Sequence, residues 1–182
     1  MESCVRYEDR AVKLLIAEDD PFFRRILEQL LGSEFEISTA ADGNLAWIML
    51  EQENGPRLAI LDWVMPGMTG PEICRLVRTT PRVAAAYLIL LTDKNSAADI
   101  TAGLRAGADD YLTKPFDPGE LRARVGMARR IVELQTDLAT QVLALEDALQ
   151  REKLLQTRVS LLRPSLHKST LASPATVAEI SK

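Results

Sequence analysis

From residue 12 onward, short apolar runs alternate along the chain with amphipathic stretches. Five of these runs are candidate strands: VKLLIA (12–17), FEISTA (35–40), RLAILD (57–62), AYLILL (86–91) and DDYLT (109–113). The first, third and fourth runs are almost entirely apolar, as central strands buried on both faces would be, whereas the second alternates and suits an edge. Strands that alternate with helical segments predict βα units on a parallel sheet. We therefore predict an α/β fold with an open, doubly wound sheet.

The segments between the candidate strands carry apolar residues at helical spacing. They predict helices over 21–31, around 45–50, around 73–77 and over 96–106. The fourth of these is rich in alanine and precedes Gly107, a plausible C-cap. A fifth helix begins with Asp117 as N-cap, Pro118 at its first position and Glu120 at its third.

The fifth helix has no clear stop before about residue 162. Its apolar residues recur every three or four positions: Ile131, Leu134, Leu138, Val142, Leu145 and Leu149. A helix of this length would be on the order of 60 Å long, and long uncapped helices favour coiled coils. We interpret 129–162 as a coiled-coil extension and 1–11 as an N-terminal lead. Residues 163–182, which are rich in Ser, Thr, Ala and Pro, are predicted to form a disordered tail.

Composition fits one soluble domain with an appendage, because 47% of the 182 residues are hydrophobic and 26% are charged. Two cysteines are too few for a disulfide framework, and the polar N-terminus has no apolar signal segment, which favours a cytoplasmic location. No apolar run approaches the roughly 20 residues of a membrane span. Residues 1–126 carry a net charge of −6 and residues 127–182 one of +2, so neither part predicts nucleic-acid binding.

Polar residues stand at the carboxyl ends of the predicted strands, where doubly wound sheets bind ligands. Glu18 and Asp19 follow the first strand, Asp62 ends the third, Thr92 follows the fourth and Lys114 follows the fifth. Clustered carboxylates repel one another by a few kcal/mol per pair at ~4 Å and an effective dielectric of ~20, so the cluster favours a cation such as Mg²⁺. A carboxylate beside such an ion can attack phosphorus, with the lysine and threonine contacting the phosphoryl oxygens.

Four motifs carry a resemblance to a known family: IAEDD, LDWVMPG, LLTD and YLTKPF. In this order and at these intervals they resemble the receiver domain of two-component response regulators, over residues 12 to about 128. The resemblance implies a flavodoxin-like sheet with strand order 2-1-3-4-5. It also implies that a histidine kinase or a phosphotransfer protein phosphorylates Asp62, and that Mg²⁺ is held by Glu18, Asp19, Asp62 and the backbone carbonyl of Val64.

The remaining family roles fall on the later motifs. By resemblance, Thr92 is the switch hydroxyl, Tyr111 is the aromatic residue that changes rotamer with it, and Lys114 contacts the phosphoryl group and precedes a cis bond to Pro115. Asp93 stands where the family usually has Ala or Gly. Its carboxylate could crowd the phosphoryl site and slow phosphorylation, or it could point to solvent as a cap before the next helix.

Two further polar residues have simpler interpretations. We interpret Asp20 as an N-cap, with water-mediated metal binding as the alternative. His167, the only histidine, is interpreted as a solvated residue of the tail.

The predicted function is a phosphorylation-controlled response regulator. Phosphate on Asp62 would alter the fourth helix, the fifth strand and the start of the fifth helix, and so control homodimerisation through that face or the C-terminal helix, or the binding of a partner. We expect no enzymatic activity beyond self-phosphorylation and self-dephosphorylation. The alternative is a scaffold that dimerises independently of phosphorylation and has a vestigial receiver pocket.

Three other classes are disfavoured. A phosphatase of the haloacid-dehalogenase class needs a second acid two residues after the nucleophile, where Val64 stands. No glycine-rich phosphate loop follows the first strand, which disfavours nucleotide binding. The roughly 50 residues after the receiver are too few for a winged helix and show no helix-turn-helix pattern, so DNA binding in this chain is not expected. A truncated form of a longer regulator stays open.

Overall fold

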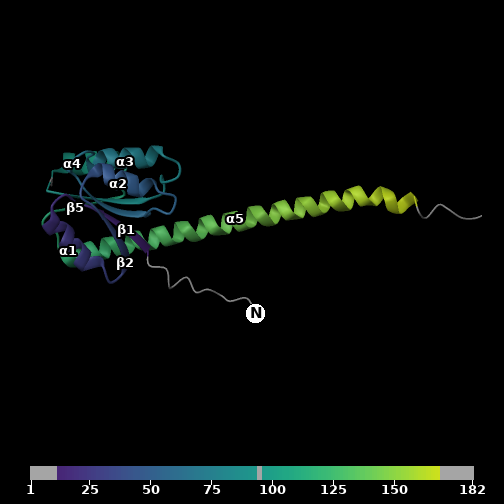
Figure 1. Ribbon diagram of the computed structural model, residues 1–182, viewed down its shortest axis with the longest axis horizontal. Helices are drawn as coiled ribbons and strands as arrows, with labels where there is room; N and C mark the ends of the chain where they lie inside the picture. Colours follow the sequence, from purple (N-terminus) through teal and green to yellow (C-terminus); the bar gives the residue numbers. More distant parts are fainter. Residues whose placement is uncertain (1–11, 94–95, 169–182) are drawn as a thin grey trace, which may run out of the picture. The chain divides into compact units, whose positions relative to one another are not determined.

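The computed structural model describes residues 12–93 and 96–168 of the chain (Figure 1). The strands are β1 (Val12–Ala17), β2 (Phe35–Ala40), β3 (Leu58–Asp62), β4 (Tyr87–Thr92) and β5 (Asp110–Thr113). The helices are α1 (Pro21–Leu31), α2 (Gly43–Glu51), α3 (Gly70–Thr79), α4 (Ala97–Arg105) and α5 (Pro118–Lys168). Strands and helices alternate in the predicted order.

The five strands form one parallel sheet in the order β2-β1-β3-β4-β5. The register pairs Ala17 of β1 with Leu61 of β3, and Asp62 of β3 with Leu91 of β4. The doubly wound fold of flavodoxin-like order is thereby confirmed, with β2 at an edge. This register brings the last residues of β1, β3 and β4 together at the carboxyl end of the sheet, where the parallel strands finish.

Two apolar cores lie on opposite faces of the sheet, because successive strand side chains point to opposite sides. On one face, strand residues such as Leu15 and Leu90 pack with residues of α2 and α3. On the other face, Leu14 and Ile60 pack with residues of α1 and of the first turns of α5. The central strands are therefore buried on both sides, as their continuous apolar runs predict.

Short polar side chains begin the helices where the sequence predicts them. Asp20 accepts a hydrogen bond from the Phe22 N–H at 2.7 Å, so its interpretation as an N-cap is confirmed. At the start of α5, Asp117 accepts a hydrogen bond from the Glu120 N–H at 2.9 Å. The C-cap of α4 is Ala106, one residue before the predicted position, and Gly107 follows it with φ of +105°, a conformation that glycine adopts without steric cost.

The helix α5 is longer than predicted. It continues to Lys168, so the first residues of the predicted tail, 163–168, are helical rather than disordered, and they include His167. Proline's fixed φ near −65° is itself helical, which lets Pro164 lie within the helix although it removes one hydrogen bond. The predicted lead, residues 1–11, and the rest of the predicted tail lie outside the described residues.

The chain divides into two units inside α5, between Thr136 and Asp137. In the second unit the apolar side chains are exposed: Leu138 by 62%, Val142 by 47%, Leu145 by 62% and Leu149 by 48%. The coiled coil itself stays a prediction. Within the part of the chain that the structure describes, no helix is both long and apolar enough to span a membrane.

Candidate functional site

The carboxyl ends of three strands bring an ammonium group between two carboxylates. Lys114, which follows β5, places its Nζ 2.7 Å from Oε2 of Glu18 and 2.7 Å from Oδ1 of Asp62. The side chains of Lys114, Glu18 and Asp62 are only 7%, 1% and 10% exposed. Three of the predicted site residues, up to 96 positions apart in sequence, are therefore in direct contact.

Burial dominates the electrostatics of this cluster. Desolvation raises the pKa of Asp62 and of Glu18 above their ordinary values, although hydrogen bonds from Lys114 act in the opposite direction. Burial lowers the pKa of Lys114, but the hydrogen bonds to Asp62 and Glu18 and the attraction of their negative charges together outweigh burial and leave that pKa raised. One ammonium thus faces more negative charge than it neutralises.

A third acid completes the cluster. One carboxylate oxygen from each of Glu18, Asp19 and Asp62 lies within 4.8 Å of the others, and Asp19 is the exposed member. Three oxygen donors at this spacing suit a hard divalent cation such as Mg²⁺. Val64 contributes its N–H, which donates to Oδ2 of Asp62 at 3.0 Å. The predicted metal contact of the Val64 carbonyl stays a prediction.

Two residues of α1 support the site, and the sequence analysis did not single them out. The guanidinium of Arg24 donates to the Glu18 carbonyl at 2.6 Å, which anchors the turn after β1. The ring of Phe23 lies under Lys114, with its centroid 4.7 Å from Nζ, a distance at which a cation–π interaction is favourable. Both residues lie one helical turn after the acidic turn, but an aromatic residue and an arginine are ordinary in a helix, so nothing in the sequence assigned them to the site.

The predicted switch residues form a second contact beside the cluster. Thr92 is 2% exposed and Tyr111 is 9% exposed, and a hydrogen bond joins their side chains. Burial raises the pKa of Tyr111, and the hydrogen bond with Thr92 partly opposes this rise. The ring of Tyr111 also meets the ring of Trp63 edge to face, with centroids 6.2 Å apart. Trp63, the residue after Asp62, is thereby in contact with Tyr111, the predicted switch residue.

Asp93 is exposed, in agreement with the prediction that it points to solvent. The further expectation that it caps α4 is wrong. The N-cap is Ser96, whose hydroxyl accepts a hydrogen bond from the Asp99 N–H at 3.1 Å. Serine is equally suited to this role, and it stands directly before the first helical residue.

The peptide bond between Lys114 and Pro115 is cis, as the resemblance implies. The Lys114 N–H donates to the Thr92 carbonyl at 2.7 Å. The ends of β4 and β5 are therefore tied together by the backbone at the position where Lys114 enters the site.

Comparison with known proteins agrees with this geometry. Residues 14–126 match the family described as response regulator receiver domain. The phosphate regulon transcriptional regulatory protein PhoB of Rhizobium meliloti (strain 1021) is 42% identical over 120 residues, which cover 65% of this chain and 52% of that protein. The DNA-binding response regulator MtrA of Mycolicibacterium smegmatis is 39% identical over 114 residues, which cover 62% of this chain and 48% of that protein.

Solved structures show the same domain. A putative response regulator from Chloroflexus aurantiacus J-10-fl superimposes with a TM-score of 0.62 at 36% identity, over 65% of this chain and 98% of that one. The BeF₃-activated DrrB receiver domain superimposes with a TM-score of 0.58 at 31% identity, over 68% of this chain and 99% of that one.

The chain spans about half the length of the curated relatives it matches. The matched region begins in β1 and ends in the first turns of α5, and it contains every residue of the acidic cluster as well as Thr92, Tyr111 and Lys114. The chain therefore belongs to the response regulator receiver family.

Proposed function

We propose that this chain is a phosphorylation-controlled switch in which Asp62 accepts a phosphoryl group from a histidine kinase or a phosphotransfer protein. The observation that carries the proposal is the arrangement around Asp62. Its carboxylate is almost buried and accepts a hydrogen bond from Nζ of Lys114 at 2.7 Å. A carboxylate oxygen from each of two further acids lies within 4.8 Å of it. Such a carboxylate is held in one orientation beside a site that favours a cation.

Each residue of the cluster has a separate role in the proposed transfer. A carboxylate oxygen of Asp62 attacks phosphorus, the bond between phosphorus and the donor's histidine nitrogen breaks, and the electron pair returns to the imidazole. Lys114 Nζ, already bonded to Asp62, would then contact a phosphoryl oxygen, as would the hydroxyl of Thr92. Mg²⁺ held by Glu18, Asp19, Asp62 and the Val64 carbonyl would neutralise charge on the transferred group.

We infer that the output is a protein–protein contact controlled by α4, β5 and α5. The hydrogen bond between Thr92 and Tyr111 links the site to β5, and the exposed leucines of α5 offer a surface for a second copy of the chain. Homodimerisation in the cytoplasm is the proposed arrangement. PhoB is named a transcriptional regulatory protein and MtrA a DNA-binding response regulator, but the net charge of −6 over residues 1–126 favours a protein partner for this chain.

The test is labelling with radioactive acetyl phosphate in the presence of Mg²⁺. The wild-type chain is expected to incorporate phosphate and Asp62→Asn is not, because the amide is a poor nucleophile. Asp99→Asn, which removes an acid at the start of α4, is the matched control and should label normally. Undiminished labelling of Asp62→Asn would overturn the assignment. Asp93→Ala belongs in the same experiment, and faster labelling would show that Asp93 hinders phosphorylation.

The second candidate function, a scaffold independent of phosphorylation, rests on the exposed apolar residues of α5 beyond Thr136. Light scattering with Mg²⁺, with and without beryllofluoride, separates the two functions. A change in mass or hydrodynamic radius on adding beryllofluoride supports the switch. An unchanged dimer would favour the scaffold.

A further inference from the structure

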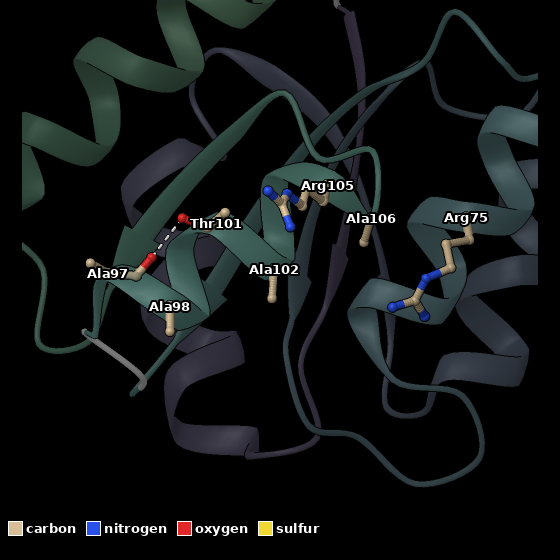
Figure 2. A pocket seen from close by; sticks show the side chains of 7 residues that line it. All are labelled: Arg75, Ala97, Ala98, Thr101, Ala102, Arg105 and Ala106. Atoms are coloured by element: carbon tan, nitrogen blue, oxygen red, sulfur yellow. Dashed lines mark hydrogen bonds between the residues drawn. The ribbon is translucent and has the colours of Figure 1, made fainter.

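A groove of about 690 Å³ lies between α3 and α4, away from the acidic cluster (Figure 2). Its walls are Arg75 of α3 and, from α4 and its C-cap, Arg105, Thr101 and four alanines. The charged atoms of the lining thus come from two arginines, and the rest of it is short side chains. No role in phosphoryl transfer falls on any of these residues.

The α4 wall is shaped for close approach by another helix. Alanine side chains leave the backbone of α4 accessible, as do the small residues at many helix–helix contacts. The hydroxyl of Thr101 donates to the Ala97 carbonyl at 2.7 Å, so its hydrogen-bonding capacity is largely used within the helix (Figure 2). A partner helix therefore meets mainly apolar surface along this wall.

The two arginines supply the charge that a partner would recognise. Both are exposed, and within the described residues neither forms a salt bridge or a side-chain hydrogen bond. Arg78, one turn from Arg75, differs: it is held by Asp109 and by the carbonyls of Gly107, Ala84 and Ala86. Glu72 stands one turn before Arg75, but its carboxylate accepts hydrogen bonds from Thr69, so neither guanidinium group has to break an ion pair before it binds a carboxylate.

We propose that this groove is the docking site for an acidic helical segment of a partner protein. Carboxylates of the segment would pair with Arg75 and Arg105, and its backbone would pack on the alanines of α4. Charge complementarity favours this occupant over a nucleic acid. A phosphate backbone needs an extended basic surface, whereas residues 1–126 carry a net charge of −6.

The groove is also physically connected to the phosphoacceptor. The helix α4 lies close to the sheet at Gly103, where an added Cβ would be 2.9 Å from Leu90, 3.1 Å from Trp63 and 3.4 Å from Tyr111. One wall of the groove thus packs against the residue that follows Asp62. An effect of phosphorylation on docking would rest on the function proposed above. Docking of the acidic segment does not require that function.

The experiment uses the full chain and two alanine-based helical peptides of equal length, one carrying glutamates and the other lysines, each labelled with fluorescein. Fluorescence anisotropy is expected to show binding of the glutamate peptide and a weaker signal for the lysine peptide. In the double variant Arg75→Glu/Arg105→Glu, affinity for the glutamate peptide should fall about tenfold and affinity for the lysine peptide should rise. Arg25→Glu, an exposed arginine of α1 on the other face of the sheet, is the matched control and should bind as wild type.

Equal affinity for the two peptides, or an equal loss in the double variant and in Arg25→Glu, would overturn the proposal. Circular dichroism of each variant verifies folding, and the gain of lysine-peptide binding cannot arise from a misfolded chain that has simply lost its groove. The binding mixture contains no phosphodonor. A failed docking experiment would therefore not contradict the assignment of Asp62 as phosphoacceptor. Unaltered labelling of Asp62→Asn would not contradict the proposed docking site.

Discussion

The sheet domain and the helix beyond Thr136 both carry regularly spaced apolar residues, but they differ in what covers them. Ile60 and Leu90 are 0% exposed, since helices cover both faces of the sheet. Leu138 and Leu145 are each 62% exposed. The sheet domain completes its core within one chain, whereas the helix carries an apolar surface that only a second surface could bury. Most helix stability in proteins comes from such packing, so burial of these side chains would stabilise the helix further.

The largest expected effect on stability comes from truncating an apolar side chain in each of the two regions. Ile60→Ala should lower the free energy of unfolding of the sheet domain by about 2–5 kcal/mol, because it leaves a cavity in a fully packed core. Leu145→Ala should leave that free energy unchanged. Urea unfolding followed by tryptophan fluorescence measures this, since Trp47 and Trp63 both lie in the sheet domain. An equal loss in Leu145→Ala would show that the two regions unfold together.

Metal binding should stabilise only the sheet domain. At about a hundredfold excess of Mg²⁺ over its Kd, the free energy of unfolding of the wild type should rise by about 2.7 kcal/mol. Asp19→Asn removes one predicted ligand and leaves the contacts among Glu18, Lys114 and Asp62, so most of the gain should disappear. Asp147→Asn, on the exposed helix, is the matched control. If Asp147→Asn also abolished the gain, the ion would not be bound at the strand ends.

The same substitution, glycine to alanine, is made at a packed position and at an exposed one. At Gly103 a methyl group would press on Leu90 and Trp63 at 2.9 and 3.1 Å, so Gly103→Ala should destabilise the fold by about 1–3 kcal/mol. At Gly126, on α5, a methyl group meets nothing within 4 Å. Gly126→Ala should therefore stabilise the chain by about 0.5–1 kcal/mol through better helix propensity. Thermal unfolding monitored by circular dichroism gives the sign of each change in stability. Two changes of the same sign would contradict the contrast between the packed and the exposed glycine.

The smallest expected effect concerns ion pairs. Arg124 joins α5 to β5 through hydrogen bonds of 2.8 and 3.0 Å to both carboxylate oxygens of Asp110. Its hydrogen bonds to Glu120 and Asp110 raise the pKa of Arg124. Arg124→Ala should cost about 1 kcal/mol, because partly exposed ion pairs contribute modestly.

Arg151 pairs with Asp147 one turn away on the exposed helix, with both side chains more than half exposed. Arg151→Ala should produce no measurable change in the unfolding of the sheet domain. Urea titrations at low and high salt measure both variants. A salt-dependent loss in Arg151→Ala comparable to that of Arg124→Ala would mean that this helix contributes to the stability of the sheet domain.

The elements of the fold were predictable because their pattern is local. The first two strands have the predicted bounds, the third and fifth begin one residue later than predicted, and the fourth is shifted by one residue at both ends. The polar ends of the strands were equally visible, which is why Glu18, Asp62 and Lys114 could be named in advance. Phe23 and Arg24 could not, because a helical aromatic residue and a helical arginine have ordinary roles in a core and on a surface. Only the fold brings them to the site.

The sequence by itself determined the alternation of strands and helices, the edge position of β2 and the identity of the acids, hydroxyl and ammonium at the strand ends. Each of these depends on neighbouring residues and on the period of the apolar pattern. Tertiary structure alone decided that Lys114 lies 2.7 Å from both carboxylates, that Gly103 lets α4 pack beside Trp63, and that Arg75 and Arg105 line one groove. These contacts join residues far apart in the chain, so they depend on strand register and on the packing of side chains between layers.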